Sequence, residues 1–371
     1  MRAVNPRWLA GLLLAIAAFS LGCAATRPHV SAPVTAAVDP NSLPGPAMFK
    51  LLCSQCHGPE AAGYAADNAP SLVSPTFLET ATDNFLRLSI ERGRPGTSMA
   101  AYSKFVGGPL DPNAIDRLVA WIRSHGPPAR DLPPVALGDS TRGRPLYEAR
   151  CQSCHGDLQK RGDAVMLANA GFLAVANDAY IQYAILKGRP GTAMASFAGT
   201  LDSLQVADLV AYVRSFARPF DASRLPPATG KEPLFAYRRG KAPEFTIREG
   251  RFVGVDQVAL ALQQRRKLVI IDARPESDWR TTHIAGAISV PHYQLSRLDE
   301  IPKDAWVITY CACPHHLSGV VVDSLRARGR PHAFVLDEGV LEWERRGYPI
   351  VAAPGVALPP AQMRSPGGAT R

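Results

Sequence analysis

The sequence predicts a multidomain protein in which two all-α domains precede one α/β domain with a parallel sheet. The first observation is a helical sequence pattern that occurs twice, over residues 45–127 and 140–217. The second is a change near residue 245 to short β-rich apolar runs that alternate with helical segments. With 371 residues, the chain is long enough for each of these domains to bury its own core.

The N-terminus predicts an exported protein. Arg2 and Arg7 precede an apolar run over residues 8–19. This run is too short to span a bilayer comfortably, so we interpret residues 1–22 as a signal peptide. We therefore expect the mature chain on the periplasmic side of a bacterial membrane.

The end of this leader resembles a bacterial lipobox. It reads Ser20-Leu21-Gly22-Cys23, and the resemblance implies that Cys23 is acylated and anchors the chain to a membrane. Ser20 stands where this pattern usually has leucine, so cleavage near Ala25 to give a soluble product stays open as the alternative. In either case residues 23–44 are expected to form a linker.

Two copies of one five-residue motif stand 98 positions apart, at residues 53–57 and 151–155. Each copy reads C-x-x-C-H, in which the two thiols can form thioethers with one haem while the adjacent imidazole binds its iron. A zinc knuckle or a redox dithiol needs no following histidine, and neither explains why the motif occurs twice. The sequence therefore predicts two covalently bound c-type haems. The residues expected to hold them are Cys53, Cys56 and His57 in the first copy and Cys151, Cys154 and His155 in the second.

The haem motif belongs to a longer repeat. Residues 93–100 match residues 188–195 at an offset of 95, and residues 118–124 match residues 209–215 at an offset of 91. Because the haem motifs are offset by 98, the second copy has lost three residues and then four more, as surface loops tolerate. This self-similarity predicts that the two all-α domains share one fold.

Each repeat is expected to contain three main helices. The first carries Gly45 or Gly143 into the haem motif, and the first and last helices are expected to cross at this small residue. The second and third helices are each expected to begin near an aspartate, and the aspartate of the second helix is expected to act as its N-cap. These aspartates are Asp83 and Asp111 in the first repeat and Asp178 and Asp202 in the second.

Both repeats resemble class I cytochrome c. In that family a methionine thioether on the loop between the last two helices is the sixth iron ligand, and the resemblance implies this role for Met99 and Met194. Met48 precedes the first motif and Met166 lies only 11 residues after the second histidine, so both are poorer candidates. Ligation by histidine and methionine leaves no open position for a substrate, which favours electron transfer over catalysis at the iron.

The two repeats differ after the haem motif. The first continues to Pro70, which resembles the family's proline whose carbonyl accepts a hydrogen bond from the iron-bound histidine. No proline lies between His155 and Pro190 in the second repeat. If the second histidine lacks this partner, its orientation and basicity change. We therefore expect the two haems to differ in potential.

The C-terminal part of the chain predicts an α/β domain. Short apolar runs rich in β-branched residues occur at 268–272, 305–310 and 333–336, as is typical of buried parallel strands. Helical segments at 255–264 and 317–328 separate them.

The details of this part resemble a rhodanese domain over roughly residues 245–352. The residues that carry the resemblance are 272–274, Trp279, 283–291, Gly339, Trp343 and 347–349. The resemblance implies that Cys311, which follows a strand ending in Tyr310, is the catalytic cysteine. Its thiolate would then lie over loop N–H groups at a helix N-terminus, which lowers a thiol pKa.

The loop after Cys311 departs from the rhodanese pattern. Rhodaneses commonly continue with glycine and arginine, whereas this chain continues with Ala312, Cys313, Pro314, His315 and His316. Without an arginine to hold an anion such as thiosulfate, either histidine is a partial substitute, and Cys313 either resolves a persulfide or is inert. Three interpretations stay open: sulfur chemistry at Cys311, a catalytically inert docking module, and a His–Cys metal site.

The formal net charge of +9 does not predict nucleic-acid binding. Loss of the leader removes Arg2 and Arg7, the haem propionates lower the charge further, and no basic run exceeds residues 265–267. A proline-rich linker over residues 218–244 and a disordered tail over residues 353–371 are expected to flank the α/β domain.

These observations predict an exported dihaem cytochrome c that exchanges electrons with periplasmic redox proteins. They leave two roles for the rhodanese-like domain: it accepts sulfane sulfur from a small donor at Cys311, or it is an inert docking module.

Overall fold

The computed structural model describes residues 38–64, 66, 68–220, 224–312 and 315–356. The leader, Cys23 and Cys313 lie outside the described residues, as does most of the C-terminal tail. All of the described residues belong to one unit, Val34–Arg371. In this part of the chain, no helix combines the length and the apolar character that crossing a membrane requires.

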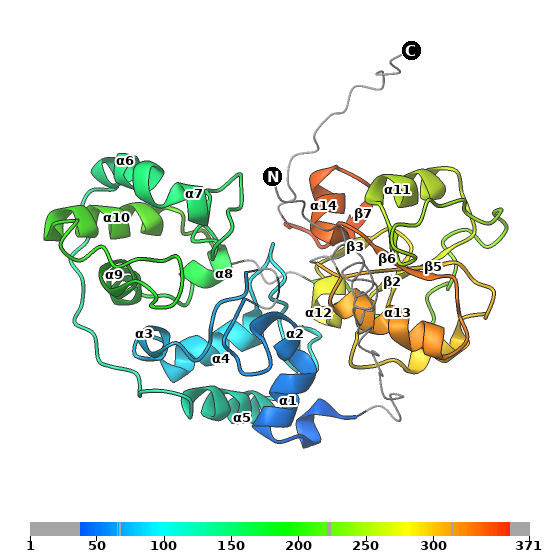
Figure 1. The fold of residues 1–371 in the computed structure, drawn as a ribbon, viewed down its shortest axis with the longest axis horizontal. Helices are drawn as coiled ribbons and strands as arrows, with labels where there is room; N and C mark the ends of the chain where they lie inside the picture. Colours follow the sequence, from blue (N-terminus) through cyan, green and yellow to red (C-terminus); the bar gives the residue numbers. More distant parts are fainter. Residues whose placement is uncertain (1–37, 65, 67, 221–223, 313–314, 357–371) are drawn as a thin grey trace, which may run out of the picture. The chain divides into compact units, whose positions relative to one another are not determined.

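The two repeats are helical, and each α-helix of the first has a counterpart in the second (Figure 1). The first repeat contains η1 (Pro40–Ser42), α1 (Gly45–Leu52), α2 (Ser54–His57), α3 (Pro75–Leu78), α4 (Asp83–Arg92), η2 (Lys104–Val106) and α5 (Pro112–Arg123). The second repeat contains α6 (Ser140–Arg150), α7 (Gln152–His155), α8 (Ala170–Leu173), α9 (Asp178–Lys187) and α10 (Ser203–Ser215). The prediction that both all-α domains share one fold is therefore confirmed.

Short polar side chains cap the last two long helices of each cytochrome repeat. α5 and α10 begin where predicted. Their N-caps are Asp111 and Asp202, whose carboxylates each accept a hydrogen bond from a backbone N–H three residues on. The prediction for α4 and α9 is wrong by one residue, because Thr82 and Asn177 are the N-caps. A hydroxyl and an amide oxygen accept this hydrogen bond as well as a carboxylate does.

The displaced aspartates, Asp83 and Asp178, instead form ion pairs at the first helical position. Asp83 pairs with Arg123 at 2.9 Å, and Asp178 pairs with Arg214 at 2.7 Å. Each arginine also donates to two backbone carbonyls in the segment just before α4 or α9. One side chain therefore ties the last helix of each repeat to the two helices that precede it.

The first and last helices of each repeat cross at a glycine, as predicted. A Cβ atom on Gly45 would lie 2.8 Å from both the carbonyl oxygen of Arg117 and the Cβ of Trp121. A Cβ atom on Gly143 would lie 2.0 Å from the carbonyl oxygen of Asp208. A larger residue at either position would therefore force the two helices apart.

The C-terminal domain contains a five-stranded parallel sheet in the order β1-β6-β5-β2-β4, and β3 and β7 form a separate antiparallel pair. The strands are β1 (Phe252–Val253), β2 (Val269–Asp272), β3 (Thr282–Ile284), β4 (Ala287–Ser289), β5 (Val307–Tyr310), β6 (Ala333–Leu336) and β7 (Ile350–Ala352). The helices are α11 (Val255–Gln263), α12 (Glu276–Trp279), η3 (Ser296–Glu300), α13 (Leu317–Ala327) and α14 (Gly339–Arg345).

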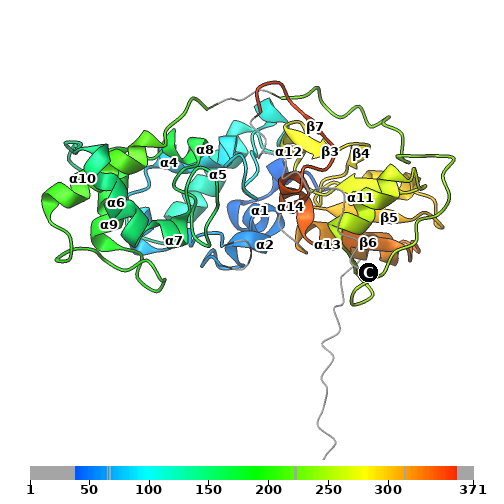
Figure 2. The ribbon, with the colours of Figure 1, turned by 90° about the horizontal axis from the view of Figure 1, so that it is seen from above.

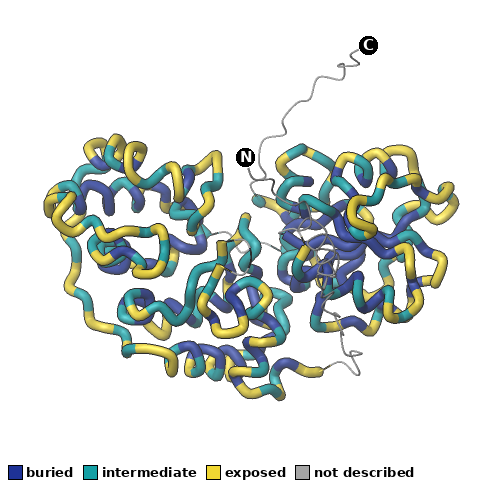
Figure 3. The backbone as a smooth tube through the Cα atoms, viewed as in Figure 1, coloured by how far each residue is buried: buried dark blue, intermediate teal, exposed yellow. Residues whose placement is uncertain are grey.

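Helices cover both faces of the parallel sheet (Figures 1 and 2). Ile271 and Val307 share an apolar cluster with side chains of α13, whereas their neighbours Ile270 and Ile308 share another with side chains of α11 and α14. Alternate residues of each strand therefore face opposite helices, and Figure 3 shows the strands as mostly buried. This burial on both sides explains why the strands are continuous apolar runs in the sequence.

Candidate functional site

A single helical turn presents the first haem-attachment motif. α2 begins directly after Cys53, whose carbonyl accepts hydrogen bonds from the backbone N–H groups of Cys56 at 3.2 Å and His57 at 3.0 Å. Gly58 ends the turn with a positive φ of 77°. Two thiols and one imidazole are thus held within one turn of the backbone.

Pro70 orients the imidazole of His57, as predicted. The Nδ1–H of His57 donates to the carbonyl oxygen of Pro70 at 2.9 Å, since a carbonyl can only accept. This hydrogen bond leaves Nε2 for an iron ion. Burial lowers the pKa of His57, which favours the neutral ring that a metal ligand requires.

The second motif has the same geometry. α7 follows Cys151, and the Nδ1–H of His155 donates to the carbonyl oxygen of Val165 at 2.7 Å. The condition that the missing proline raised, a second histidine without a carbonyl partner, is therefore not met. Val165 stands 95 positions after Pro70, so the three residues lost from the second repeat lie between the histidine and this carbonyl. Because any residue supplies a backbone carbonyl, the missing proline carried no information.

The two predicted methionine ligands lie in loops of matching backbone geometry. The carbonyl of Met99 accepts a hydrogen bond from the N–H of Arg94 at 2.7 Å, and the carbonyl of Met194 accepts one from Arg189 at 2.8 Å. In both loops a threonine hydroxyl accepts from the methionine N–H at 3.1 Å. The competing Met48 is fully buried in the core. Ligation by Met99 and Met194 stays a prediction.

The donor groups of both repeats fit a covalently bound haem. Each repeat offers two thiols and an imidazole from one turn, and each imidazole has its Nδ1 engaged by a backbone carbonyl. This is the donor set for two thioether bonds and one axial iron ligand.

The two sites differ in their access to solvent. His57 is buried, whereas His155 is partly exposed. Ala101, which follows the first methionine loop, is 3% exposed, but Ser196 at the equivalent position of the second repeat is exposed. The first site is therefore enclosed by surrounding protein to a greater degree than the second.

Arg94 and Arg189 connect the two repeats reciprocally. Nη1 of Arg94 donates to the carbonyl of Gly171 in the second repeat, and Nη1 of Arg189 donates to the carbonyl of Thr76 in the first, both at 3.4 Å. The two arginines are 95 positions apart, and so are the two acceptors. The same contact is therefore made in both directions.

An aromatic pair lies at the same junction. Phe85 and Tyr180, also at equivalent positions, stack with their ring centroids 4.9 Å apart. The guanidinium of Arg94 lies 5.8 Å from the Phe85 ring, and that of Arg189 lies 5.5 Å from the Tyr180 ring. Burial lowers the pKa of Arg94 to about 10, so the guanidinium stays charged at neutral pH.

The C-terminal domain places Cys311 directly after β5, as predicted. Its Sγ lies 3.3 Å from Oγ of Ser318, in the first turn of the 11-residue helix α13. A helix N-terminus favours negative charge, so this position stabilises a thiolate or a persulfide anion. Sequence reasoning missed Ser318, although a serine at the start of a predicted helix was an available signal.

A buried network fixes the strand end that precedes Cys311. The hydroxyl of Tyr310 donates to Oδ2 of Asp272 at 2.9 Å, and Nη2 of Arg274 donates to the same oxygen at 2.7 Å. Burial raises the pKa of Tyr310, so its hydroxyl stays protonated and keeps donating. This network is structural, because its hydrogen bonds hold neighbouring strand ends in register.

The rest of the Cys311 loop only partly meets the sequence prediction. Nε2 of His315 lies 2.9 Å from Oδ1 of Asp337, and its ring packs 4.1 Å from the ring of Phe252. One of the two histidines predicted to replace the missing arginine is therefore held by a carboxylate. Among the described residues no three His, Cys, Asp or Glu side chains gather at one point. Cys313, which belongs to the loop where a His–Cys metal site was left open, lies outside those residues.

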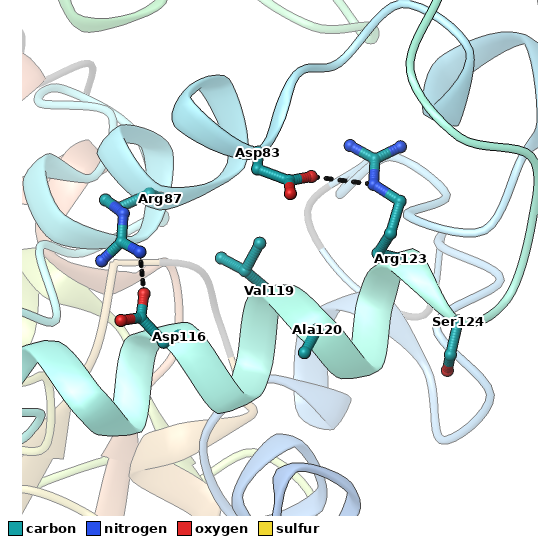
Figure 4. A pocket seen from close by; sticks show the side chains of 7 residues that line it. All are labelled: Asp83, Arg87, Asp116, Val119, Ala120, Arg123 and Ser124. Carbon is teal, nitrogen blue, oxygen red and sulfur yellow. Dashed lines mark hydrogen bonds and ion pairs between the residues drawn. The ribbon is translucent and has the colours of Figure 1, made fainter.

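A hollow of about 450 Å³ lies between α4 and α5 (Figure 4). Its charged lining is already paired: Arg87 with Asp116, and Arg123 with Asp83. None of its lining residues belongs to a haem motif, a methionine loop or the Cys311 loop. We interpret it as a surface depression between two structural ion pairs.

Comparison with known families agrees with this division of the chain. Residues 42–126 match the family model described as cytochrome c, and residues 138–213 match that of the cbb3-type cytochrome c oxidase subunit III. Residues 255–346 match the rhodanese-like domain. The chain therefore carries two cytochrome c domains, with two covalently bound c-type haems, followed by a rhodanese-like domain.

Individual relatives cover parts of the chain. A cbb3-type cytochrome c oxidase subunit CcoP from Azospirillum sp. (strain B510) is 28% identical over 189 residues, which are 46% of this chain and 60% of that protein. A sulfurtransferase from Allochromatium vinosum is 28% identical over 27% of this chain and 94% of that protein. The solution NMR structure of a rhodanese-like domain from Anabaena sp. is 23% identical, with a TM-score of 0.27, over 33% of this chain and 89% of that one.

Proposed function

We propose that this protein is an exported electron carrier whose rhodanese-like domain accepts sulfane sulfur at Cys311. The observation that carries the sulfur chemistry is the contact between Sγ of Cys311 and Ser318 at the N-terminus of α13. When bound, the haems supply reversible one-electron exchange at two separate centres. The chain's own residues supply the place where sulfur is held.

The first step is a sulfur transfer without net oxidation. The thiolate of Cys311 attacks the terminal sulfur of a donor R–S–S⁻, a new S–S bond forms on the cysteine, and the donor's S–S bond breaks to release the thiol R–SH. The proton on that thiol comes from water. The product, Cys311–S–S⁻, carries its charge next to the first turn of α13, where the helix dipole stabilises an anion.

The second step is oxidation of the bound sulfur in two-electron stages. Each stage adds one oxygen atom from water, as in Cys311–S–S⁻ + H2O → Cys311–S–SO⁻ + 2 H⁺ + 2 e⁻, with one new S–O bond. Two electrons match the capacity of two one-electron haem centres. A redox partner protein of the periplasm is the final acceptor.

The donor is expected to be a polysulfide or a glutathione persulfide rather than thiosulfate. The loop has no arginine to bind a dianion, and His315 is engaged with Asp337. Persulfide formation requires the thiolate, so its rate should rise with pH through the titration of the Cys311 thiol.

Mass spectrometry of the donor-treated protein tests this function. We expect a gain of one sulfur atom, about 32 daltons, at Cys311, and no gain in Cys311→Ser. Ser318→Ala removes a hydroxyl that contacts Sγ and should slow the transfer about two- to five-fold. Cys313→Ser is the control thiol, and it should slow turnover without preventing the first transfer. A wild-type protein that gains no sulfur from any donor would exclude the function.

Export rests on the leader, with Cys23 as the proposed lipid anchor. Labelling with a radioactive fatty acid should mark the wild type and not Cys23→Ala. A soluble periplasmic form without label would instead support cleavage near Ala25.

A second function is favoured by the burial of Cys311, which is only 1% exposed. A donor reaches a thiol at this depth only if the surrounding loop moves. If no donor does so, the rhodanese-like domain is an inert docking module, and the protein is an electron carrier alone.

A further inference from the structure

The rhodanese-like domain contacts the first cytochrome domain through the segments that follow β2 and β4. Oγ of Ser277, in α12, donates to the carbonyl of Ala101. A Cβ atom on Gly107 would lie 2.8 Å from Cδ of Arg280. The side chain of Tyr293 packs against the apolar core of the cytochrome domains. This contact combines a hydrogen bond, close backbone packing and buried apolar area.

These contacting segments belong to the sheet edge that carries Cys311. The register of the parallel sheet pairs Asp272, the last residue of β2, with both Ser289 and Tyr310, the last residues of β4 and β5. The residues that follow the three strands therefore emerge at the same edge. The edge that holds the candidate sulfur site is the edge that meets the first cytochrome domain.

We propose that this contact is a coupling surface between Cys311 and the first cytochrome domain. The first cytochrome domain, and not the second, is then the redox partner of Cys311. The proposal rests on the proposed function and names the partner within the chain that receives the electrons from sulfur oxidation.

A short series of bonds crosses this surface. The N–H of Ala273 donates to the carbonyl of Tyr310 at 2.9 Å, and the N–H of His292 donates to the carbonyl of Ala273 at 3.1 Å. The ring of His292 lies against the backbone of Leu51, in a close approach rather than a well-formed hydrogen bond. Two hydrogen bonds and one contact thus connect the residue before Cys311 with α1, and α1 runs directly into the haem cysteine Cys53.

Water is excluded along this series. His292 is 5% exposed, and neither of its ring nitrogens has a hydrogen-bond partner among the described residues. Burial lowers the pKa of His292 to about 4, so the ring is neutral at neutral pH. Tyr102, which is 7% exposed, donates its hydroxyl to the carbonyl of Leu52 at 3.0 Å. Around His292 and Tyr102 the junction is dry, and a low local dielectric strengthens electrostatic coupling between the two sides.

The second cytochrome domain leaves its equivalent face exposed. Ser196 occupies the position that corresponds to Ala101, yet it is exposed, whereas Ala101 is covered and bonded to Ser277. The second domain is therefore the one left accessible to an external redox partner.

The test compares Tyr293→Ala with the matched control Tyr237→Ala, because Tyr237 is 37% exposed in the connector. Both holoproteins are treated with glutathione persulfide, and the sulfur adduct at Cys311 and the rate of haem reduction are measured separately. Tyr293→Ala should gain the adduct as the wild type does but reduce haem about five-fold more slowly or more, because it opens the junction. Tyr237→Ala should match the wild type in both measurements.

A redox titration gives a readout that does not depend on turnover. Tyr293→Ala should lower the potential of the first haem only, because water then reaches the first site. The first haem is identified as the one whose potential also responds to Met99→Ala. Ser277→Ala, which removes one hydrogen bond and leaves no large cavity, should change both readouts in the same direction and less strongly.

The outcomes separate the two proposals. In one outcome the wild type gains the sulfur adduct, while Tyr293→Ala and Ser277→Ala have the same rate of haem reduction and the same two potentials as the wild type. The coupling surface is then refuted and the sulfur function stands. If the wild type gains no adduct, the sulfur function fails and the coupling of Cys311 fails with it.

Discussion

The two cytochrome domains of this chain share their internal bonds and differ in their surroundings. In both, a backbone carbonyl orients the haem-motif histidine, and one arginine joins the last helix to the segment before α4 or α9. Only the first site is enclosed: His57 is buried, whereas His155 is partly exposed. Both copies of the duplicated domain therefore keep the hydrogen bonds made within the domain. The exposure of each haem site depends on what packs against that domain.

The largest expected effect separates the two haems. Cys53→Ala with Cys56→Ala should lower the haem content from two per chain to one, since no thioether can form in the first domain. Cys151→Ala with Cys154→Ala should do the same for the second. A pyridine haemochrome assay measures the content, and the unchanged chain should give two. If either double variant lost both haems, the two domains would not load independently.

Substitution of the methionines should change the potentials. Met99→Ala or Met194→Ala should remove one sulfur ligand and lower the potential of that haem alone, by something on the order of 0.1–0.3 V. Redox titration and the weak near-infrared band of sulfur-ligated ferric haem report the change, and Met48→Ala is the control. Potentials and band that survive both substitutions would show that these loops have a structural role only.

Substitution of the shared arginines should destabilise the two domains equally. Arg123→Ala and Arg214→Ala each remove an ion pair and two hydrogen bonds to backbone carbonyls, at a cost of about 2–4 kcal/mol in the free energy of unfolding. Arg87→Ala, which loses a more exposed ion pair, should cost less than about 1 kcal/mol. Thermal unfolding followed at the haem absorption band measures all three. Unequal losses for the first two variants would contradict the equivalence of the repeats.

The smallest expected effect is the difference between the native potentials. The enclosed first haem should have the higher potential, because burial disfavours the extra charge of the ferric state. This basis replaces the proline difference, since His155 does have a carbonyl partner in Val165. A redox titration that fits one common potential would remove the distinction between the sites.

The sequence predicted those parts of the fold that depend on side-chain type. The haem cysteines, the helix starts at Asp111 and Asp202 and the crossing glycines were predicted because only a few residue types serve there. The predicted caps of α4 and α9 were wrong by one residue. Thr82 and Asn177 are the caps, because threonine and asparagine serve there as effectively as aspartate does.

The remaining features depend on backbone groups and long-range contacts, which no local sequence pattern predicts. Val165 acts through its carbonyl, which every residue has, so its role could not be predicted. The contact of Ser277 with Ala101 joins residues 176 positions apart, and no local pattern signals such a pairing. The short strands β1 and β7 likewise form by pairing with β6 and β3, which lie far from them in the sequence.

The reciprocal contacts of Arg94 and Arg189 have a consequence for the history of the chain. When residue i of one unit meets residue j of the other, and j meets i, the contact has the form of a two-fold symmetric homodimer. A single-copy ancestor with one such arginine could already have paired with itself. Fusion of two copies would then have replaced a concentration-dependent association with an intramolecular one. Each copy was thereby released to diverge on the faces that do not touch the other.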